Sequence, residues 1–238
     1  MREQTPIITE SEKSWFWQLI ILILFFITAV IFWDTLLIYP IKLLVVVFHE
    51  LSHGLMSVAV GGKIIKIQID YRLGGYCESS IPASHLASIA VSSAGYLGSL
   101  IWGGIILVLA LRTDKDRWIT GIIGLIVLGI SYYVFITGEM FGILFCLGFG
   151  ITLLLAAAFL PNVFHDYFLK FIGITNCLYV IIDIKEDLIS RSNVGSDADA
   201  IAELTGLPSI GIGVVWLLVA LLFLYFILKL GLKMPKNT

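Results

Sequence analysis

The chain has 238 residues, of which 59% are hydrophobic and only 13% are charged, whereas roughly 25% are charged in an ordinary soluble domain. A mean hydropathy of +1.00 excludes a soluble globular protein, and a net charge of −2 excludes a nucleic-acid-binding protein that works through a basic surface. Three widely spaced cysteines make neither a disulfide framework nor a CxxC metal site. The composition therefore predicts an all-α polytopic membrane protein.

Seven segments meet the requirement for a transmembrane helix, which is about 20 mostly apolar residues. We predict about seven transmembrane helices in a single integral membrane domain over residues 1–238, in the cell membrane. Lysine and arginine residues divide seven to seven between the two sides, so the positive-inside rule leaves the orientation open. The predicted spans lie near residues 15–39, 41–60, 85–111, 118–137, 140–160, 161–184 and 210–230.

A β-hairpin is predicted over residues 64–80, directly after the second span. Residues 65–72 alternate apolar and polar side chains with a period of two, which is typical of a half-buried strand. Gly74 and Gly75 follow as a tight turn. The side of the strand expected to face the helices or the membrane carries Ile65, Ile67, Ile69 and Tyr71.

A short interfacial helix is predicted before the last span. It begins at Ser196 with an S-x-x-D capping pattern and runs to Leu204. Gly206 and Pro208 then stop it.

The second span carries the sequence His49-Glu50-Leu51-Ser52-His53, which is an H-E-x-x-H pattern. Residues four apart share one face of a helix, so both imidazoles can bind one metal ion. Glu50 is placed to take a proton from the water that the metal activates. Ionisable side chains inside a span are costly and usually functional, so we predict a catalytic Zn²⁺ site with Glu50 as the base.

Two histidines leave Zn²⁺ one protein ligand short. The predicted second and sixth spans run in the same direction, and His53 and Asp183 both lie toward the same-side end of their spans. We therefore predict Asp183 as the third ligand. Asp187, one turn farther out, and Glu139, in the loop between the fourth and fifth spans, remain as alternatives.

Substrate contacts are predicted at the strand and on the sixth span. An extended peptide can add to the edge of the strand that carries Ile67 and Ile69. An amide such as that of Asn176 is costly in lipid without a partner, so Asn176 either orients substrate or makes an interhelical hydrogen bond. The small residues of Ser93–Ser99 on the third span are interpreted as a face that packs against the second span.

Three motifs resemble the site-2 protease family of intramembrane zinc metalloproteases, in its compact branch without a PDZ domain. They are F-H-E-L-S-H-G, S-A-G-Y-L-G-S, and L-Y-V-I-I-D-I-K-E-D-L followed by G-S-D-A. The resemblance extends from Val45 to Leu217. It implies that zinc is held by His49, His53 and an Asp that maps to Asp183. This Asp stands in Ile182-Asp183-Ile184 rather than in the L-D-G sequence of well-studied members.

The function predicted from the sequence is zinc-dependent proteolysis of membrane-anchored protein substrates in the lipid bilayer, without a nucleic-acid partner. A catalytically inactive relative that binds membrane proteins is the alternative, although it has no need of Glu50 between two ligands. A transporter is disfavoured because no inverted repeat is apparent.

Overall fold

A computed structural model describes residues 10–185 and 195–233, which are mostly helical. Six helices in this part are long and apolar enough to cross a membrane, namely α2, α3, α4, α5, α6 and α8. The predicted all-α membrane class, with a hairpin after the second helix, is confirmed. The elements in chain order are α1 (Glu10–Ile31), α2 (Tyr39–Ala59), β1 (Lys63–Ile69), β2 (Gly75–Ser80), α3 (His85–Arg112), α4 (Asp116–Phe135), α5 (Met140–Phe159), α6 (Asn162–Lys185), α7 (Asp197–Thr205) and α8 (Ser209–Lys233).

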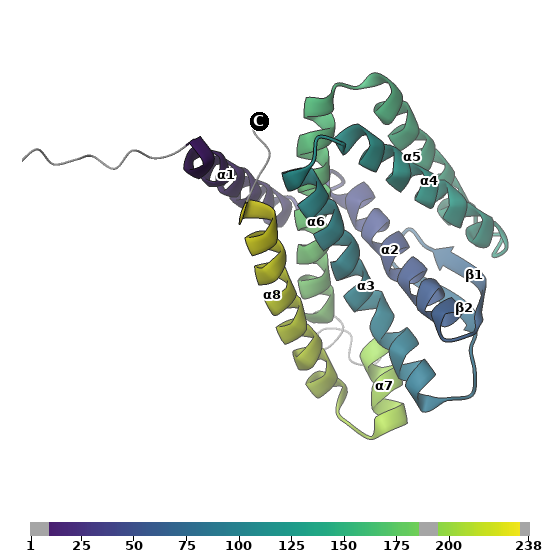
Figure 1. Ribbon diagram of the computed structural model, residues 1–238. Helices are drawn as coiled ribbons and strands as arrows, with labels where there is room; N and C mark the ends of the chain where they lie inside the picture. The colour runs from purple at the N-terminus through teal and green to yellow at the C-terminus, as the bar shows by residue number, and fades with distance from the viewer. Residues whose placement is uncertain (1–9, 186–194, 234–238) are drawn as a thin grey trace, which may run out of the picture.

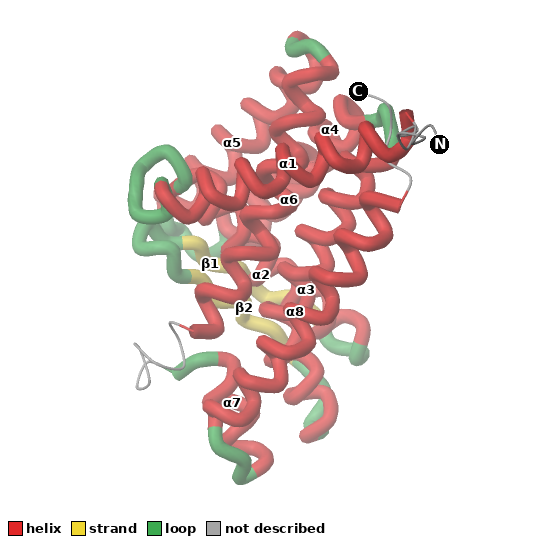
Figure 2. Tube along the Cα trace, turned by 90° about the vertical axis from the view of Figure 1, so that its left-hand side faces the viewer, coloured by secondary structure: helices red, strands yellow, loops and turns green. Residues whose placement is uncertain are grey.

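Helices α2, α3 and α6 form the middle of the bundle (Figure 1). Helices α4 and α5 pair with each other on one side of it, and α8 packs on α3 and α6 on the other. The short helix α7 lies against α3 and α8 at one end, while α1 crosses α6 toward the opposite end (Figure 2). Helix α2 therefore has protein on several sides, and its residues 41–48 are all buried.

The first predicted span is shorter than expected because α1 ends at Ile31 and turns follow. Two side chains stabilise the chain between α1 and α2. Pro40 is pre-organised for the first turn of α2. Lys42 donates to the Trp33 carbonyl oxygen at 3.1 Å and lies over the Trp33 ring, so it satisfies a carbonyl group that the broken helix leaves without a helical partner.

The antiparallel hairpin β1–β2 packs on α2 and reaches α4 and α5. Ile67 and Ile69 are completely buried, as the alternation predicted. Ile65 and Tyr71 are exposed instead, which corrects the expectation that all four apolar side chains face inward. A register shift between Ile64 and Lys66 turns Ile65 outward.

The hairpin turn also ends the strand three residues earlier than predicted. The Asp70 carboxylate accepts hydrogen bonds from the backbone N–H groups of Arg72 and Gly74. Such a side chain competes with the strand ladder for backbone groups, so Tyr71 lies in the turn. There its carbonyl oxygen accepts a hydrogen bond of 2.6 Å from the hydroxyl of Tyr39, which ties the hairpin tip to the start of α2.

The predicted short helix is confirmed as α7. Ser196 and Asp199 form a reciprocal capping box at its N-terminus. Gly206 ends it in the left-handed conformation with a φ of 72°.

Candidate metal centre

The H-E-x-x-H sequence lies in the buried part of α2, where Glu50 and His53 are buried and His49 is half-buried. The rings of His49 and His53 are 4.8 Å apart between centroids. His53 and Glu50 are 8% and 5% exposed. The helix thus presents two imidazoles and a carboxylate within little more than one turn, away from lipid.

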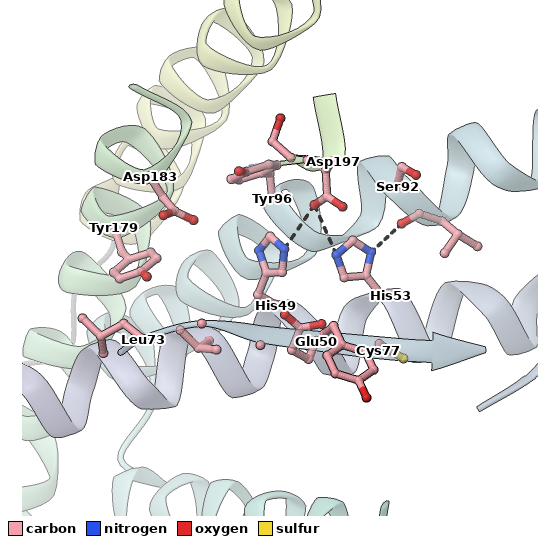
Figure 3. Close-up of a pocket in the computed structure, with 17 residues that line it drawn as sticks. His49, Glu50, His53, Leu73, Cys77, Ser92, Tyr96, Tyr179, Asp183 and Asp197 are labelled. Carbon is pink, nitrogen blue, oxygen red and sulfur yellow. Dashed lines mark hydrogen bonds and ion pairs between the residues drawn. The ribbon is translucent and has the colours of Figure 1, made fainter. Parts of the chain in front are cut away.

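Asp197, the first residue of α7, completes a group of possible metal ligands with the two histidines (Figure 3). Its Oδ2 atom lies 3.1 Å from Nε2 of His49 and 3.2 Å from Nε2 of His53. The ligand atoms of the three residues all lie within 4.8 Å of one another, and this is the one such group in residues 10–185 and 195–233. Two imidazole nitrogens and one carboxylate oxygen with a position left open are the donor set of a catalytic zinc site.

Neighbouring groups prepare the two imidazoles for a metal. Nδ1 of His53 lies 2.7 Å from the carbonyl oxygen of Val91 on α3. Because a carbonyl oxygen can only accept, Nδ1 of His53 carries a proton, so Nε2 is the ring nitrogen that faces Asp197 and is left for a metal. The ring of Tyr96 meets that of His49 edge to face, with centroids 5.0 Å apart.

Gly95 makes room for the ligand atoms where α3 crosses α2. A Cβ atom at this position would clash with Nε2 of both His49 and His53. Gly98, one turn later, sits equally close to the side chain of Ser52. The small residues of Ser93–Ser99 thus form the packing face against α2 that the sequence predicted, and they also border the metal centre.

The Asp197 carboxyl is held in the ionised form that metal ligation requires. Burial alone would raise its pKa, but the attraction of His53 and the hydrogen bond from His49 outweigh burial and keep the pKa below its usual range. The N-terminus of α7 further favours a negative charge on its first residue.

Glu50 lies between α2 and the start of β2. A Cβ atom on Gly75 would lie 2.8 Å from Oε1 of Glu50, so the absence of a side chain at Gly75 lets the strand approach the carboxylate. Cys77 on the same strand lies nearby, but burial, together with the charge of Glu50, raises its thiol pKa to about 12. A protonated thiol is a poor nucleophile.

These side chains open into one pocket of about 370 Å³. Its walls come from α2, the turn before β2 and its first residues, α3, α6, and the segment that begins α7. Glu50, the two histidines and Asp197 all line it. The pocket therefore brings Glu50 together with the three possible metal ligands.

A family model described as Peptidase M50B-like matches residues 20–227, which is most of the chain. The protein belongs to this family. The match confirms the resemblance to the site-2 proteases, and no PDZ domain is found. Membership indicates an intramembrane metalloprotease, and the six apolar helices fit an integral membrane protein. No curated protein and no solved structure matched.

In this M50B-like protein, Asp183 lies in the same pocket but outside the group of possible ligands. Figure 3 shows it beside Tyr179, apart from the two imidazoles. It also borders a smaller polar pocket of about 170 Å³, together with Asp34 and Lys42. The expected topology was right to bring α6 to the site, but the carboxylate next to both histidines is that of Asp197.

The two alternative acids lie elsewhere. Glu139 is the N-cap residue of α5 and does not line the pocket. Asp187 falls in residues 186–194, outside the described part of the chain.

The predicted substrate-binding residues do not line the pocket. Ile67 and Ile69 are fully buried in the hydrophobic core, where β1 faces α4 and α5. It is β2, from Gly75 to Cys77, that borders the pocket. Asn176 is fully buried at the α3–α6 contact, where its Cβ lies 3.0 Å from the Cβ position of Gly103. Its amide atoms have no hydrogen-bond partner within residues 10–185 and 195–233. Of the two predicted roles of Asn176, the interhelical hydrogen bond is therefore not formed among the described residues.

Asp197 is not among the ligands predicted from the sequence, because it lies outside the predicted spans and not directly beside them. The S-x-x-D pattern placed Asp197 in a helix outside the membrane, and nothing in that pattern says where the helix docks. The signal in the sequence that could have indicated Asp197 is the G-S-D-A motif, which contains this residue and is one of the motifs that resemble the site-2 protease family.

Proposed function

We propose that the protein is a zinc-dependent intramembrane endopeptidase that hydrolyses peptide bonds of membrane-anchored proteins. One observation carries the proposal. His49, His53 and Asp197 converge on one point while Glu50 lines the same pocket. A structural zinc site would be closed by four protein ligands, whereas three ligands and a base are typical of hydrolysis.

His49, His53 and Asp197 would hold the ion, in place of the set with Asp183 that the sequence favoured. When bound, zinc supplies Lewis acidity, which lowers the pKa of water and polarises the scissile carbonyl group. The contact from His53 to Val91 and the space at Gly95 leave the imidazole Nε2 atoms free to face the ion that these residues would hold.

Glu50 acts as the general base and then as the acid. Its carboxylate takes the proton of the attacking water and delivers it to the amine that leaves. Its 5% exposure keeps bulk water away from this proton transfer. An inactive binding protein would have no use for a buried carboxylate at this point, so the contents of the pocket favour the enzyme over the alternative of a non-catalytic relative.

The substrate would lie along β2. Among the described residues the sheet has two strands, so the outer edge of β2 has no strand beside it. Backbone groups between Gly75 and Cys77 border the pocket and can pair with an extended peptide. Pairing of this kind uses hydrogen bonds to the substrate backbone, so it depends little on the substrate's side chains. It would also hold the substrate in an extended rather than a helical conformation next to Glu50.

The deciding experiment compares Glu50→Gln with Glu139→Gln in the purified full-length protein. Removal of the base should lower cleavage of a membrane-anchored model substrate by about 10²-fold to 10⁴-fold or more, while zinc content stays at the wild-type level. Glu139→Gln makes the same chemical change outside the pocket and should cleave as the wild type does. Unchanged turnover in Glu50→Gln would contradict the proposed mechanism.

A further inference from the structure

The third ligand stands on a different kind of element from the first two. Asp197 belongs to α7, which has nine residues and is not among the helices that could cross a membrane. A helix this short has little stability of its own. The position of the Asp197 carboxylate therefore depends on the contacts that dock α7 on the bundle.

An apolar contact provides one part of this docking. Ala198 and Ile201 are 2% and 5% exposed and join a cluster with Trp216 of α8 and Tyr96 of α3. Apolar burial is not directional, so these side chains hold α7 down without fixing where its first residue points.

A polar contact fixes the N-terminus of α7. Oδ2 of Asp199 accepts hydrogen bonds of 2.9 Å from both the backbone N–H and the hydroxyl of Ser196. Its Oδ1 accepts one of 2.5 Å from the hydroxyl of Ser209, the first residue of α8. One carboxylate thus ties the N-terminal cap of α7 to the first residue of α8.

Asp199 and Asp197 point in different directions from the same turn. Two residues are separated by about 200° around a helix, so the turn that presents Asp197 to the imidazoles presents Asp199 to α8. Capping alone would need only Ser196 and the backbone. The additional bond to Ser209 is a tertiary contact, and it adds nothing to α7 considered as an isolated helix.

We propose that Asp199 is a positioning residue of the metal centre: its bridge between Ser196 and Ser209 holds the start of α7 where Asp197 meets His49 and His53. The inference rests on the proposed function, since it assumes that Asp197 binds zinc. Asp199 itself does not touch the metal ligands, and it acts through the placement of α7.

The test measures zinc affinity by competition with a chelator in the purified full-length protein. Asp199→Asn and Asp199→Ala should weaken zinc binding by about 10-fold to 100-fold, as is typical when a group that orients a ligand is lost. Glu203→Gln is the matched control, because Glu203 is exposed on the same helix and loses the same charge.

Variants of Ser209 distinguish an effect on the position of α7 from an effect on its folding. Ser209→Ala removes only the bond to α8 and leaves the capping box intact, so it should weaken zinc binding and speed amide hydrogen exchange in residues 198–205. Ser209→Thr keeps the hydroxyl and should restore both. A loss of general stability would not be rescued by one hydroxyl group.

Two outcomes would overturn the inference, and they are distinguishable. If the wild type holds zinc and loses it in Asp197→Ala, but the variants of Asp199 and Ser209 bind zinc as tightly as Glu203→Gln, then Asp199 does not position the ligand. If the wild type binds no zinc, the proposed function itself fails and the inference fails with it.

Discussion

Helices α2 and α7 contribute to the same centre in opposite ways. Helix α2 is buried over most of its length and carries His49 and His53 four residues apart, so their proximity follows from helix geometry alone. Helix α7 is short, lies outside the candidate spans and brings Asp197 from 144 positions beyond His53, by subtraction of the residue numbers. The first two proposed ligands are thus brought together by local structure, whereas the placement of the third depends on how α7 docks.

The largest effect should come from removing the ligand on α7. Asp197→Ala should weaken zinc binding by at least about 100-fold, since it removes one of three protein ligands. Asp183→Ala should keep zinc near the wild-type level, because Asp183 lies outside the ligand group. Metal analysis of the two purified variants makes the comparison. Loss of zinc in Asp183→Ala alone would restore the ligand that the sequence predicted.

Removal of zinc should affect the two helices unequally. A chelator should speed amide hydrogen exchange in α7 by about 10-fold or more, since binding energy then no longer stabilises its docked position. Exchange in residues 44–57 of α2 should change far less, because packing with α3 and the hairpin remains. Exchange followed by mass spectrometry, with and without the chelator, measures both segments in one sample. Equal changes in exchange in α2 and α7 would contradict the idea that only α7 depends on zinc for its docked position.

A smaller effect is expected from the apolar contact under α7. Ile201→Val removes one buried methylene, which costs about 1 kcal/mol and should lower protection of α7 from exchange by about five-fold. Ile210→Val is the matched control, since Ile210 is 60% exposed at the start of α8. If α7 is equally protected from hydrogen exchange in Ile201→Val and Ile210→Val, Ile201 does not contribute to docking.

The hairpin shows which features of a strand the alternation of apolar and polar residues can predict. Alternation correctly predicted a strand after α2 with Ile67 and Ile69 on its buried face. It could not reveal the register shift at Ile64 and Lys66, because a bulge depends on the partner strand. It also suggested that the first strand would border the site, whereas packing against α4 and α5 buries β1 and leaves β2 at the pocket.

The sequence by itself determined the membrane class, the apolar helices that follow the first predicted span, and the placement of His49 and His53 on one face of α2. Each of these follows from composition or from the period of a single element, which nearby residues dictate. It also determined the limits of α7, because capping by Ser196 and a left-handed Gly206 are local.

Only the tertiary structure decided which carboxylate joins the histidines. Asp183 and Asp197 are both acids that line the pocket. No rule that depends on neighbouring residues alone predicts which of them lies next to the histidines. The choice depends on how α7 rests on α3 and α8, through Ile201, Trp216 and the bridge from Asp199 to Ser209. Contacts of this kind join residues that are distant or differently oriented in the chain, so their energies appear only when the helices have packed.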